Sequence, residues 1–372
     1  STEIFSPVRI RSLAAVRQEE VKLMITGILA STSTDNSVKV NMKVVFSELM
    51  FNVIMKIIAG KRYFGVNTDS EVEEGQKFRV VFDEMFSTLE VASPQDFLPF
   101  LKWFGFKRME NRLTKLAKEL DQLFQKLIEE RRSERGKVQS TVIDVLLSLQ
   151  ETDREQYSDK LIKGMILSLI AAGTHTTAGT MEWAMSLLLN HPEALLKVRD
   201  EIDKKVGQDR LIDHSDLQNL SYLNNAIKES LRLFPTAPLL LAHESSAECT
   251  VGGFTIPSNT ILFANAYALH RDPKVWTDPV SFKPERFENN GQQGSRIYVP
   301  FGLGRRSCPG EGLATQVVGL ALGTLIQCFE WDRNGEEKVD MTDGSGLAMH
   351  MEKPLEAMCK PRQSIVDVIN RL

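Results

Sequence analysis

Apolar residues recur at intervals of three and four positions along most of the chain, which is the periodicity of amphipathic helices. In the range 107–135 one face carries Leu113, Leu116, Leu120, Phe124 and Leu127. Pro192 suits the first turn of a helix and Gly207 its end, whereas Pro235 stops the helix that precedes it. The pattern predicts helices over residues 46–58, 107–135, 160–190, 192–207, 220–234 and 312–329.

The pattern changes in the C-terminal half of the sequence. The stretch 249–256 places apolar residues on both sides of Gly252-Gly253, which predicts a β-hairpin. A proline-rich segment over 272–284 and a glycine-rich loop over 302–310 follow, and no internal repeat occurs. These features predict a mainly α fold with a small β part, formed by residues 1–372 as a single domain.

The composition excludes several classes of protein. Of the 372 residues, 42% are hydrophobic and 25% are charged, so the chain is neither disordered nor fibrous. Its 45 Lys and Arg against 49 Asp and Glu give a net charge of −4, which does not favour nucleic-acid binding. The 4 cysteines contain no Cys-x-x-Cys pair, so neither a disulfide scaffold nor a structural zinc site is expected.

Neither a membrane span nor a signal peptide is expected within the sequence. The longest apolar stretches, residues 164–173 and 317–329, are shorter than the roughly 18–20 residues that a span needs. The sequence begins with Ser1 and enters an amphipathic stretch at once, where a Met and a mobile tail are more usual. We therefore expect that an upstream portion is missing from it.

The segment 301–310 is the part of the sequence that is most informative about function. It reads Phe-Gly-Leu-Gly-Arg-Arg-Ser-Cys-Pro-Gly. Its three glycines let the backbone approach a flat or bulky group. Cys308 lies just before a predicted helix and near Arg305 and Arg306, and both the helix dipole and the cations favour a thiolate. Such a thiolate is a nucleophile or a metal ligand, whereas a small buried cysteine in a turn is the simpler interpretation. No histidine lies within about thirty residues on either side, which weakly disfavours a cysteine hydrolase.

The same segment resembles the haem-binding loop of the cytochrome P-450 superfamily, Phe-x-x-Gly-x-Arg-x-Cys-x-Gly. The specified positions are filled by Phe301, Gly304, Arg306, Cys308 and Gly310. Three further motifs follow the order of the family: residues 172–177 resemble the oxygen-activation segment, 229–232 the Glu-x-x-Arg helix and 282–287 the meander. The chain is therefore identified as a member of this superfamily, which implies the cytochrome P-450 fold.

The resemblance assigns roles to the residues of the loop. Cys308 is the expected axial ligand of the iron in haem b, since electron donation from its sulfur favours O–O cleavage. Arg306 and His243 are expected to pair with haem propionates, and Phe301 to pack near the sulfur. Gly304 and Gly310 are expected to belong to the same cofactor site. For His243, an ordinary loop histidine is the alternative.

Glu229, Arg232 and Arg286 are expected to hold the fold together. Glu229 and Arg232 are three residues apart and share a helix face. The resemblance places Arg286 in the meander, where the three residues would form a charge network that fixes the meander and the cysteine loop. The alternative for such a pair is a surface ion pair worth about 0–1 kcal/mol.

Thr176 and His175 are the expected catalytic residues. In the family an acid commonly precedes this threonine, whose hydroxyl and a water chain deliver protons during oxygen activation. Here His175 replaces the acid and is expected to relay protons, because the pKa of a histidine is ordinarily near neutral. A histidine that merely faces solvent is the alternative. Gly173, with Ala172, is expected to open a notch in the helix for oxygen and so belongs to the cofactor site.

Substrate contacts are expected from three segments chosen by their position relative to the motifs. The residues are mostly small and apolar, which suits a flat or hydrophobic molecule, and ordinary core packing is the alternative for each. The candidates are Ser168, Leu169 and Ala172 of the central helix, Ala237 and Leu239 after the Glu-x-x-Arg helix, and Leu347 near the C-terminal end.

The resemblance implies a monooxygenase that inserts one oxygen atom from O2 into a small hydrophobic or aromatic plant metabolite. The chain resembles plant microsomal members and is similar to the group that contains isoflavone 2′-hydroxylases. Electrons would come from NADPH through NADPH–cytochrome P-450 reductase, and an N-terminal anchor would hold the protein at the cytosolic face of the endoplasmic reticulum membrane. A reductase-independent haem-thiolate isomerase or dehydratase, and a non-catalytic haem-binding chain, are the alternatives.

Overall fold

The computed structural model describes residues 5–32, 37–65, 73, 75–78, 80–82, 84–85, 98, 108–134, 141–290 and 297–369. The chain forms two compact units. Unit 1 comprises Ser1–Ala14, Val21–Phe46 and Thr176–Leu372, and unit 2 comprises Ala15–Glu20 and Ser47–His175. That all residues act as one catalytic domain stays a prediction.

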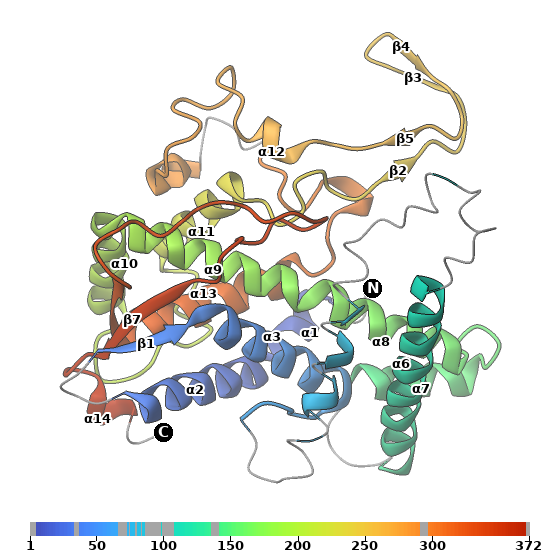
Figure 1. Cartoon of the computed structure of the whole chain (residues 1–372), viewed down its shortest axis with the longest axis horizontal. Coiled ribbons are helices and arrows are strands. Elements are labelled where there is room, and N and C mark those ends of the chain that lie inside the picture. Colours follow the sequence, from blue (N-terminus) through green and yellow to red (C-terminus); the bar gives the residue numbers. More distant parts are fainter. Residues whose placement is uncertain are drawn as a thin grey trace. The chain divides into compact units, whose positions relative to one another are not determined.

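Helices dominate both units, as the sequence predicted (Figure 1). The longer described helices are α2 (Ala14–Ser31), α3 (Met42–Ala59), α6 (Arg108–Ser133), α7 (Val142–Thr152), α8 (Asp159–Gly173), α9 (His175–Asn190), α10 (Pro192–Lys205), α11 (Ser221–Leu233) and α13 (Glu311–Cys328). The shorter ones are α1 (Pro7–Ser12), α12 (Ala266–Leu269), α14 (Val366–Ile369) and the 3-10 helices η2 (Pro284–Asn290) and η3 (Gly304–Arg306). Within the described residues, no helix is long and apolar enough to cross a bilayer.

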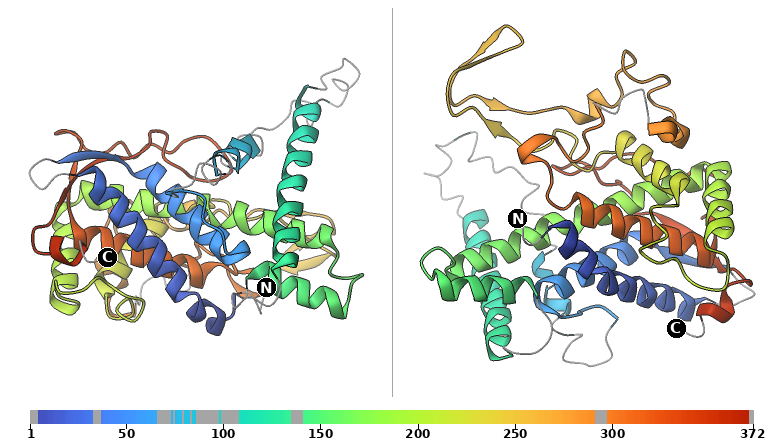
Figure 2. Two further views of the ribbon diagram at one scale, coloured as in Figure 1. Left: turned by 90° about the horizontal axis from the view of Figure 1, so that it is seen from below. Right: turned by 180° about the vertical axis from the view of Figure 1, so that it is seen from behind.

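Unit 2 is built on the long helix α6, which contacts both α7 and α8 (Figure 2, left). Of the apolar face predicted for it, Leu116, Leu120, Phe124 and Leu127 are buried, whereas Leu113 is exposed. Two ion pairs join its C-terminal end to the following helices. Arg131 lies 2.6 Å from Asp144 at the start of α7, and Arg132 lies 2.5 Å from Asp159 at the start of α8.

The core of unit 1 is formed by α9, α10, α11 and α13. The helix α9 is buried on all sides from Thr177 to Leu189, and α13 from Val317 to Cys328. Most of their side chains are apolar, as expected for helices that present no face to solvent over these ranges, although Glu182 of α9 and Gln327 of α13 are buried too. The helices α10 and α11 pack on α13 (Figure 1). Pro192 begins α10 as predicted, and Gly207 follows its end with a φ of +85°.

Small antiparallel sheets complete unit 1. The described strands are β1 (Val38–Asn41), β2 (His243–Glu244), β3 (Cys249–Val251), β4 (Phe254–Ile256), β5 (Ile261–Leu262), β6 (Phe329–Arg333) and β7 (Glu356–Pro361). The order of one sheet is β1-β7-β6, with Val38 opposite Cys359, and the sequence pattern did not predict it. The predicted hairpin is confirmed as β3–β4: Gly252 and Gly253 have φ of +58° and +85°, as a two-residue turn with both residues left-handed requires. This hairpin extends away from the helices of unit 1 (Figure 2, right).

The structure corrects one predicted helix. Residues 160–190 form two helices rather than one, because α8 ends at Gly173 and α9 begins at His175. Thr174 caps α8, and its hydroxyl donates a 2.7 Å hydrogen bond to the carbonyl of Ile170. A threonine hydroxyl bonded to the carbonyl four residues earlier competes with the helical backbone and bends it. The break at Thr174 lies two residues before Thr176.

Candidate active site

The segment 301–310 forms a closed loop at the start of α13. The backbone amide of Cys308 donates to the carbonyl of Phe301 at 2.8 Å and so joins the two ends of the loop. Gly302 and Gly304 have φ of +72° and +73°, a conformation that other residues adopt only with strain. Gly310 has an ordinary φ of −85° and caps α13. Backbone conformation therefore demands glycine at the first two positions and not at the third.

The Cys308 residue is exposed, and its sulfur faces the backbone N–H groups of Gly310 and Glu311. Desolvation by the protein atoms around the sulfur raises the pKa of the thiol above its ordinary value, and the charge of Glu311 raises it further, whereas the two amides lower it. The amides at the start of the helix therefore favour the thiolate as predicted, but desolvation has the larger effect, so the pKa of the free thiol is raised. Coordination to a metal cation reverses this balance, since a bound thiol is deprotonated.

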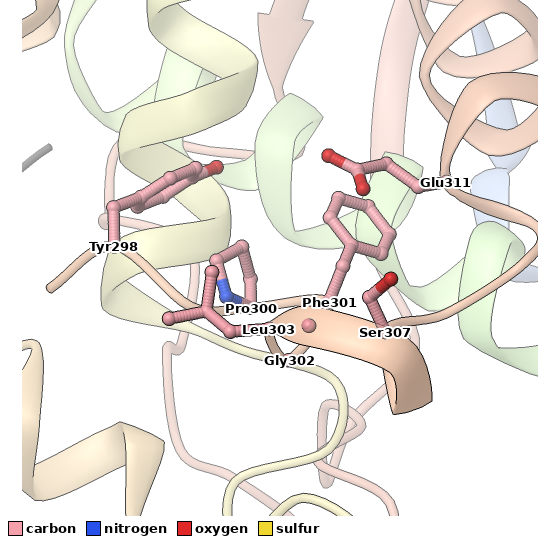
Figure 3. A pocket seen from close by; sticks show the side chains of 8 residues that line it. Tyr298, Pro300, Phe301, Gly302, Leu303, Ser307 and Glu311 are labelled. Atoms are coloured by element: carbon pink, nitrogen blue, oxygen red, sulfur yellow. The ribbon is translucent and has the colours of Figure 1, made fainter. Parts of the chain in front are cut away.

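A hollow of about 220 Å³ lies beside the loop (Figure 3). Phe301 and Gly304 of the motif line it, and Tyr298 and Glu311 face one another across it. Burial and the negative charges of Glu311 and Glu229 raise the pKa of Tyr298. Its hydroxyl therefore keeps its proton at neutral pH and presents a neutral group to the hollow.

The structure brings Glu229, Arg232 and Arg286 together. Glu229 and Arg232 are both 0% exposed, and Arg232 donates from Nε and Nη2 to the two carboxylate oxygens at 2.7 and 2.8 Å. Arg286 Nε and the backbone amide of Lys283 each donate to Glu229 Oε1 at 3.0 Å. The alternative of a surface ion pair is therefore wrong, because the carboxylate is fully buried and bonded from both α11 and the segment 283–286.

One residue of this region that the sequence pattern did not mark is His270. Arg232 Nη1 donates to the His270 carbonyl at 2.6 Å, and His270 Nε2 accepts from the backbone amide of Val299 at 2.9 Å. Its ring stacks on Tyr298 with the ring centroids 5.7 Å apart. The two hydrogen-bonding partners lie 38 and 29 residues away in the sequence, so no local pattern could have identified the residue.

Thr176 is half-buried and lies in the first turn of α9. Two hydroxyl groups donate hydrogen bonds to its backbone carbonyl. That carbonyl accepts from the hydroxyl of Thr180 at 2.9 Å and from that of Thr236 at 3.5 Å. The Thr236 carbonyl in turn accepts from the backbone amide of Met349 at 2.9 Å. These contacts connect α9 to two of the segments expected to meet substrate, although the sequence did not predict the hydroxyl contacts.

Gly173 and several other predicted residues lie in unit 2. A Cβ atom on Gly173 would lie 2.7 Å from Cδ1 of Ile54, so the close approach of α8 to α3 favours glycine at this position. The predicted notch for oxygen stays a prediction. Of the other candidates in unit 2, Ser168, Ala172 and His175 are exposed and Leu169 is half-buried.

The remaining predicted residues lie at the surface of unit 1. Arg306 is exposed at the end of η3, and His243 is exposed in β2 opposite Leu262. In the described part of the chain, no hydrogen bond or ion pair joins His243 to the cysteine loop. Ala237 is half-buried, Leu239 is 46% exposed and Leu347 is 79% exposed, so core packing is the wrong interpretation for the two leucines.

The residues of the loop fit a haem group. The sulfur of Cys308 is a soft ligand at an exposed position, and the two left-handed glycines leave the adjacent backbone without side chains. Among the described residues, no cluster of three His, Cys, Asp or Glu side chains could hold a metal ion. The iron of a haem group takes most of its ligands from the porphyrin, so one protein ligand such as the Cys308 sulfur suffices. Fold and site together fit a haem-thiolate protein.

Comparison with known proteins gives the family. Residues 1–357 match the cytochrome P-450 family, and the chain belongs to it. A cytochrome P-450 of Catharanthus roseus is 50% identical over 370 residues, which are 100% of this chain and 73% of that protein. The (+)-piperitol/(+)-sesamin synthase of Sesamum radiatum is 46% identical over 100% of this chain and 72% of its own length. An isoflavone 2′-hydroxylase of Glycyrrhiza echinata is 43% identical over 99% of this chain and 73% of its own length.

The family membership settles the class of reaction. The chain is a haem-dependent monooxygenase that receives electrons through a redox partner and acts on a small substrate together with O2. Its mainly α fold with a small β part is that of the family. The predictions of family, fold class, enzyme class and cofactor are thereby confirmed.

Proposed function

We propose that this enzyme inserts one atom of O2 into a small aromatic plant metabolite of the flavonoid or phenylpropanoid type. The other oxygen atom leaves as water, and NADPH supplies the two electrons through a reductase. Isoflavone hydroxylases and a (+)-piperitol/(+)-sesamin synthase, aligned over nearly the whole chain, support this substrate class. The closed loop that holds Cys308, an exposed residue, just before α13 is the observation that carries the proposal.

Cys308 is the proposed ligand of the haem iron. When bound, haem supplies the centre at which O2 is activated. The amides of Gly310 and Glu311 face the sulfur and stabilise negative charge on it. Arg306 and His243 are proposed to bind the propionates, and Phe301 to pack near the sulfur. Gly304, which has a left-handed backbone, and Gly310 are proposed to let the loop backbone approach the flat haem ring.

Thr176 is the proposed proton donor at the reaction centre, acting through Oγ1. His175 is proposed to bring protons to it from solvent, and the exposure of its side chain supports exchange with bulk water. The hydroxyls of Thr180 and Thr236 donate to the Thr176 carbonyl and so orient this turn of α9. Gly173 is proposed to leave room beside this turn for oxygen.

Substrate would be held by apolar side chains from three segments. Leu239 and Leu347 are exposed apolar side chains of unit 1 that suit contact with an aromatic ring. The other proposed contacts are Ala237 of the same unit and Ser168, Leu169 and Ala172 of unit 2.

NADPH–cytochrome P-450 reductase is the proposed redox partner. We further propose that the enzyme is attached to the endoplasmic reticulum membrane and faces the cytosol, where this reductase is available to it. Fractionation of cells that express the full-length protein tests this location. Recovery with the reductase in microsomes is expected, and recovery in the membrane-free fraction would contradict it.

Reconstitution with the reductase tests the proposed reaction. The full-length enzyme is incubated with NADPH, 18O2 and a panel of isoflavones, flavones and lignans, and the products are analysed by mass spectrometry. We expect a product that carries one 18O atom and that forms only when NADPH and reductase are both present. A product formed without them would favour an isomerase or dehydratase, and no turnover of any member of the panel would contradict the proposed substrate class.

The role of Thr176 is tested by Thr176→Ala, with Thr176→Ser as the matched control. The alanine variant is expected to consume NADPH while forming less product, whereas the serine variant keeps the hydroxyl and the coupling. Equal ratios of product to NADPH in the alanine variant and the wild type would contradict the proposed role.

A further inference from the structure

We propose that His270 is a positioning residue, which links the buried Glu229 network to the Cys308 loop and thereby holds the sulfur in place for the iron. The inference rests on the proposed role of Cys308 as ligand. It assigns a function to a residue that lies outside the motifs of the sequence and far along the chain from the cysteine.

The first part of the link is the backbone of His270. Its carbonyl accepts a 2.6 Å hydrogen bond from Arg232, whose other nitrogens hold the Glu229 carboxylate. Trp276 reinforces this position, since its indole Nε1 donates to the carbonyl of Leu269 at 3.1 Å and the Arg232 guanidinium lies 5.2 Å from its ring centroid. The backbone at His270 is therefore fixed by the charge network itself.

The second part of the link is the imidazole ring. It is 0% exposed, stacks on Tyr298 and meets Trp276 edge to face, with the ring centroids 5.7 and 6.4 Å apart. Because the backbone N–H of Val299 points at Nε2 at 2.9 Å, Nε2 carries no proton and acts as an acceptor. Burial and the charge of Arg232 lower the pKa of His270 to about 4, so the ring stays neutral and keeps this acceptor at neutral pH.

The third part of the link is the short backbone path from Val299 to the sulfur. The Val299 carbonyl accepts from the amide of Gly302 at 3.0 Å, and the Phe301 carbonyl accepts from the amide of Cys308 at 2.8 Å. Releasing Val299 from His270 would loosen the base of the loop, because the two ends of the loop are tied only a few residues away. An apolar core residue in place of His270 would leave the Val299 N–H buried and unsatisfied.

Two variants of His270 separate the acceptor from the rest of the side chain. His270→Phe keeps the aromatic stack on Tyr298 but has no acceptor, whereas His270→Gln places an amide oxygen near the position of Nε2. Asn190→Leu is the matched control, because Asn190 Oδ1 likewise accepts from a backbone amide, that of Val339, at 2.8 Å. This control removes the same kind of bond at the end of α9, together with the bond that Asn190 Nδ2 donates to the Val339 carbonyl at 3.0 Å.

The readout is the ratio of thiolate-ligated to thiol-ligated protein in the reduced carbon-monoxide spectrum of the full-length enzyme. We expect His270→Phe to lower this ratio about tenfold, the effect of one unsatisfied buried N–H, and His270→Gln to restore most of it. Asn190→Leu should leave the ratio unchanged. An unchanged ratio in His270→Phe, or an equal loss in Asn190→Leu, would overturn the inference.

A second readout is independent of the bound iron. Hydrogen exchange at the amides of Val299 and Gly302 should be faster in folded His270→Phe than in the wild type and close to wild type in His270→Gln. If the phenylalanine variant does not fold, His270→Asn replaces it, since its shorter amide does not reach the position of Nε2. A wild type that shows no thiolate-ligated form would instead contradict the role of Cys308, so the two failures are distinguishable.

Discussion

The hydroxyl oxygens of Thr180 and Thr236 lie 3.1 Å apart, although 56 residues separate the two positions in the chain. Thr180 also donates to the carbonyl of Thr176, and the Thr236 carbonyl accepts from the amide of Met349. Next to this cluster, Trp183 Nε1 donates to the carbonyl of Met349 at 3.1 Å. The turn that carries the proposed catalytic threonine is thus held to two segments that are proposed to meet substrate.

Replacing Thr236 by valine tests this cluster. Thr236→Val removes the hydroxyl at nearly constant volume, so we expect a loss of about 0.5–1.5 kcal/mol in the free energy of unfolding. The ratio of product to NADPH consumed should also fall, because the turn at Thr176 loses a contact. Thr236→Ser should keep both values near wild type. Thr324→Val is the control, since its buried hydroxyl bonds only within α13, to Leu320; an equal fall in the product ratio there would contradict the account.

The burial of Glu229 leads to a prediction about stability. Glu229→Gln leaves Arg232 buried without its carboxylate, so we expect the free energy of unfolding to fall by about 3–5 kcal/mol. The matched control is Glu285→Gln in the same meander, where a partly exposed carboxylate pairs with Lys197 and a change of only about 0–1 kcal/mol is expected. Urea unfolding measures both, and similar losses in the two variants would contradict a dominant role for the buried network.

The pKa of His270 leads to a prediction about pH. Folding lowers the pKa from its ordinary 6.5 to about 4, through burial first and then the charges of Arg232 and Arg271. The unfolded chain therefore binds the proton more tightly between these values, and stability is lost as the pH falls from 6.5 to 4. The loss from this residue alone should reach about 3 kcal/mol.

Comparison with His270→Gln isolates this effect from the carboxylates, whose pKa values shift in both directions. Glu182 has a raised pKa because of burial, whereas that of Asp159 is lowered to about 2 by hydrogen bonds from Arg132. The unfolding free energy of the wild type minus that of the variant should fall steadily, by about 3 kcal/mol, from pH 6.5 to pH 4. A difference that does not change over this interval would show that His270 titrates at its ordinary pKa.

Local features of the fold could be predicted from the sequence. The helix beginning at Pro192 and the turn at Gly252-Gly253 follow from backbone preferences of single residues, and both are confirmed. The sheet of β1, β7 and β6 could not be predicted, because it pairs Val38 with Cys359 from opposite ends of the chain. The break at Thr174 was missed because it depends on the hydrogen bond from the Thr174 hydroxyl to the Ile170 carbonyl, which the sequence pattern does not show.

In the candidate site too, features that depend on local sequence could be predicted and features that depend on distant residues could not. The motif identified Cys308, and the spacing of Glu229 and Arg232 identified their pairing, since both signals are local in sequence. His270 and Thr180 were missed because their partners are distant in the chain. The raised pKa of the Cys308 thiol could not be predicted, because neighbouring charges are visible in the sequence, whereas desolvation depends on the packing around the sulfur.

The ligation of iron by Cys308 is the central claim and has a direct measurement. The carbon-monoxide difference spectrum of the reduced, full-length protein is recorded for the wild type and for Cys308→Ser. We expect a strongly red-shifted Soret band in the wild type, which reports thiolate-ligated iron, and no such band in the serine variant. Absence of the band from the folded wild type, or the same band in Cys308→Ser, would contradict the account.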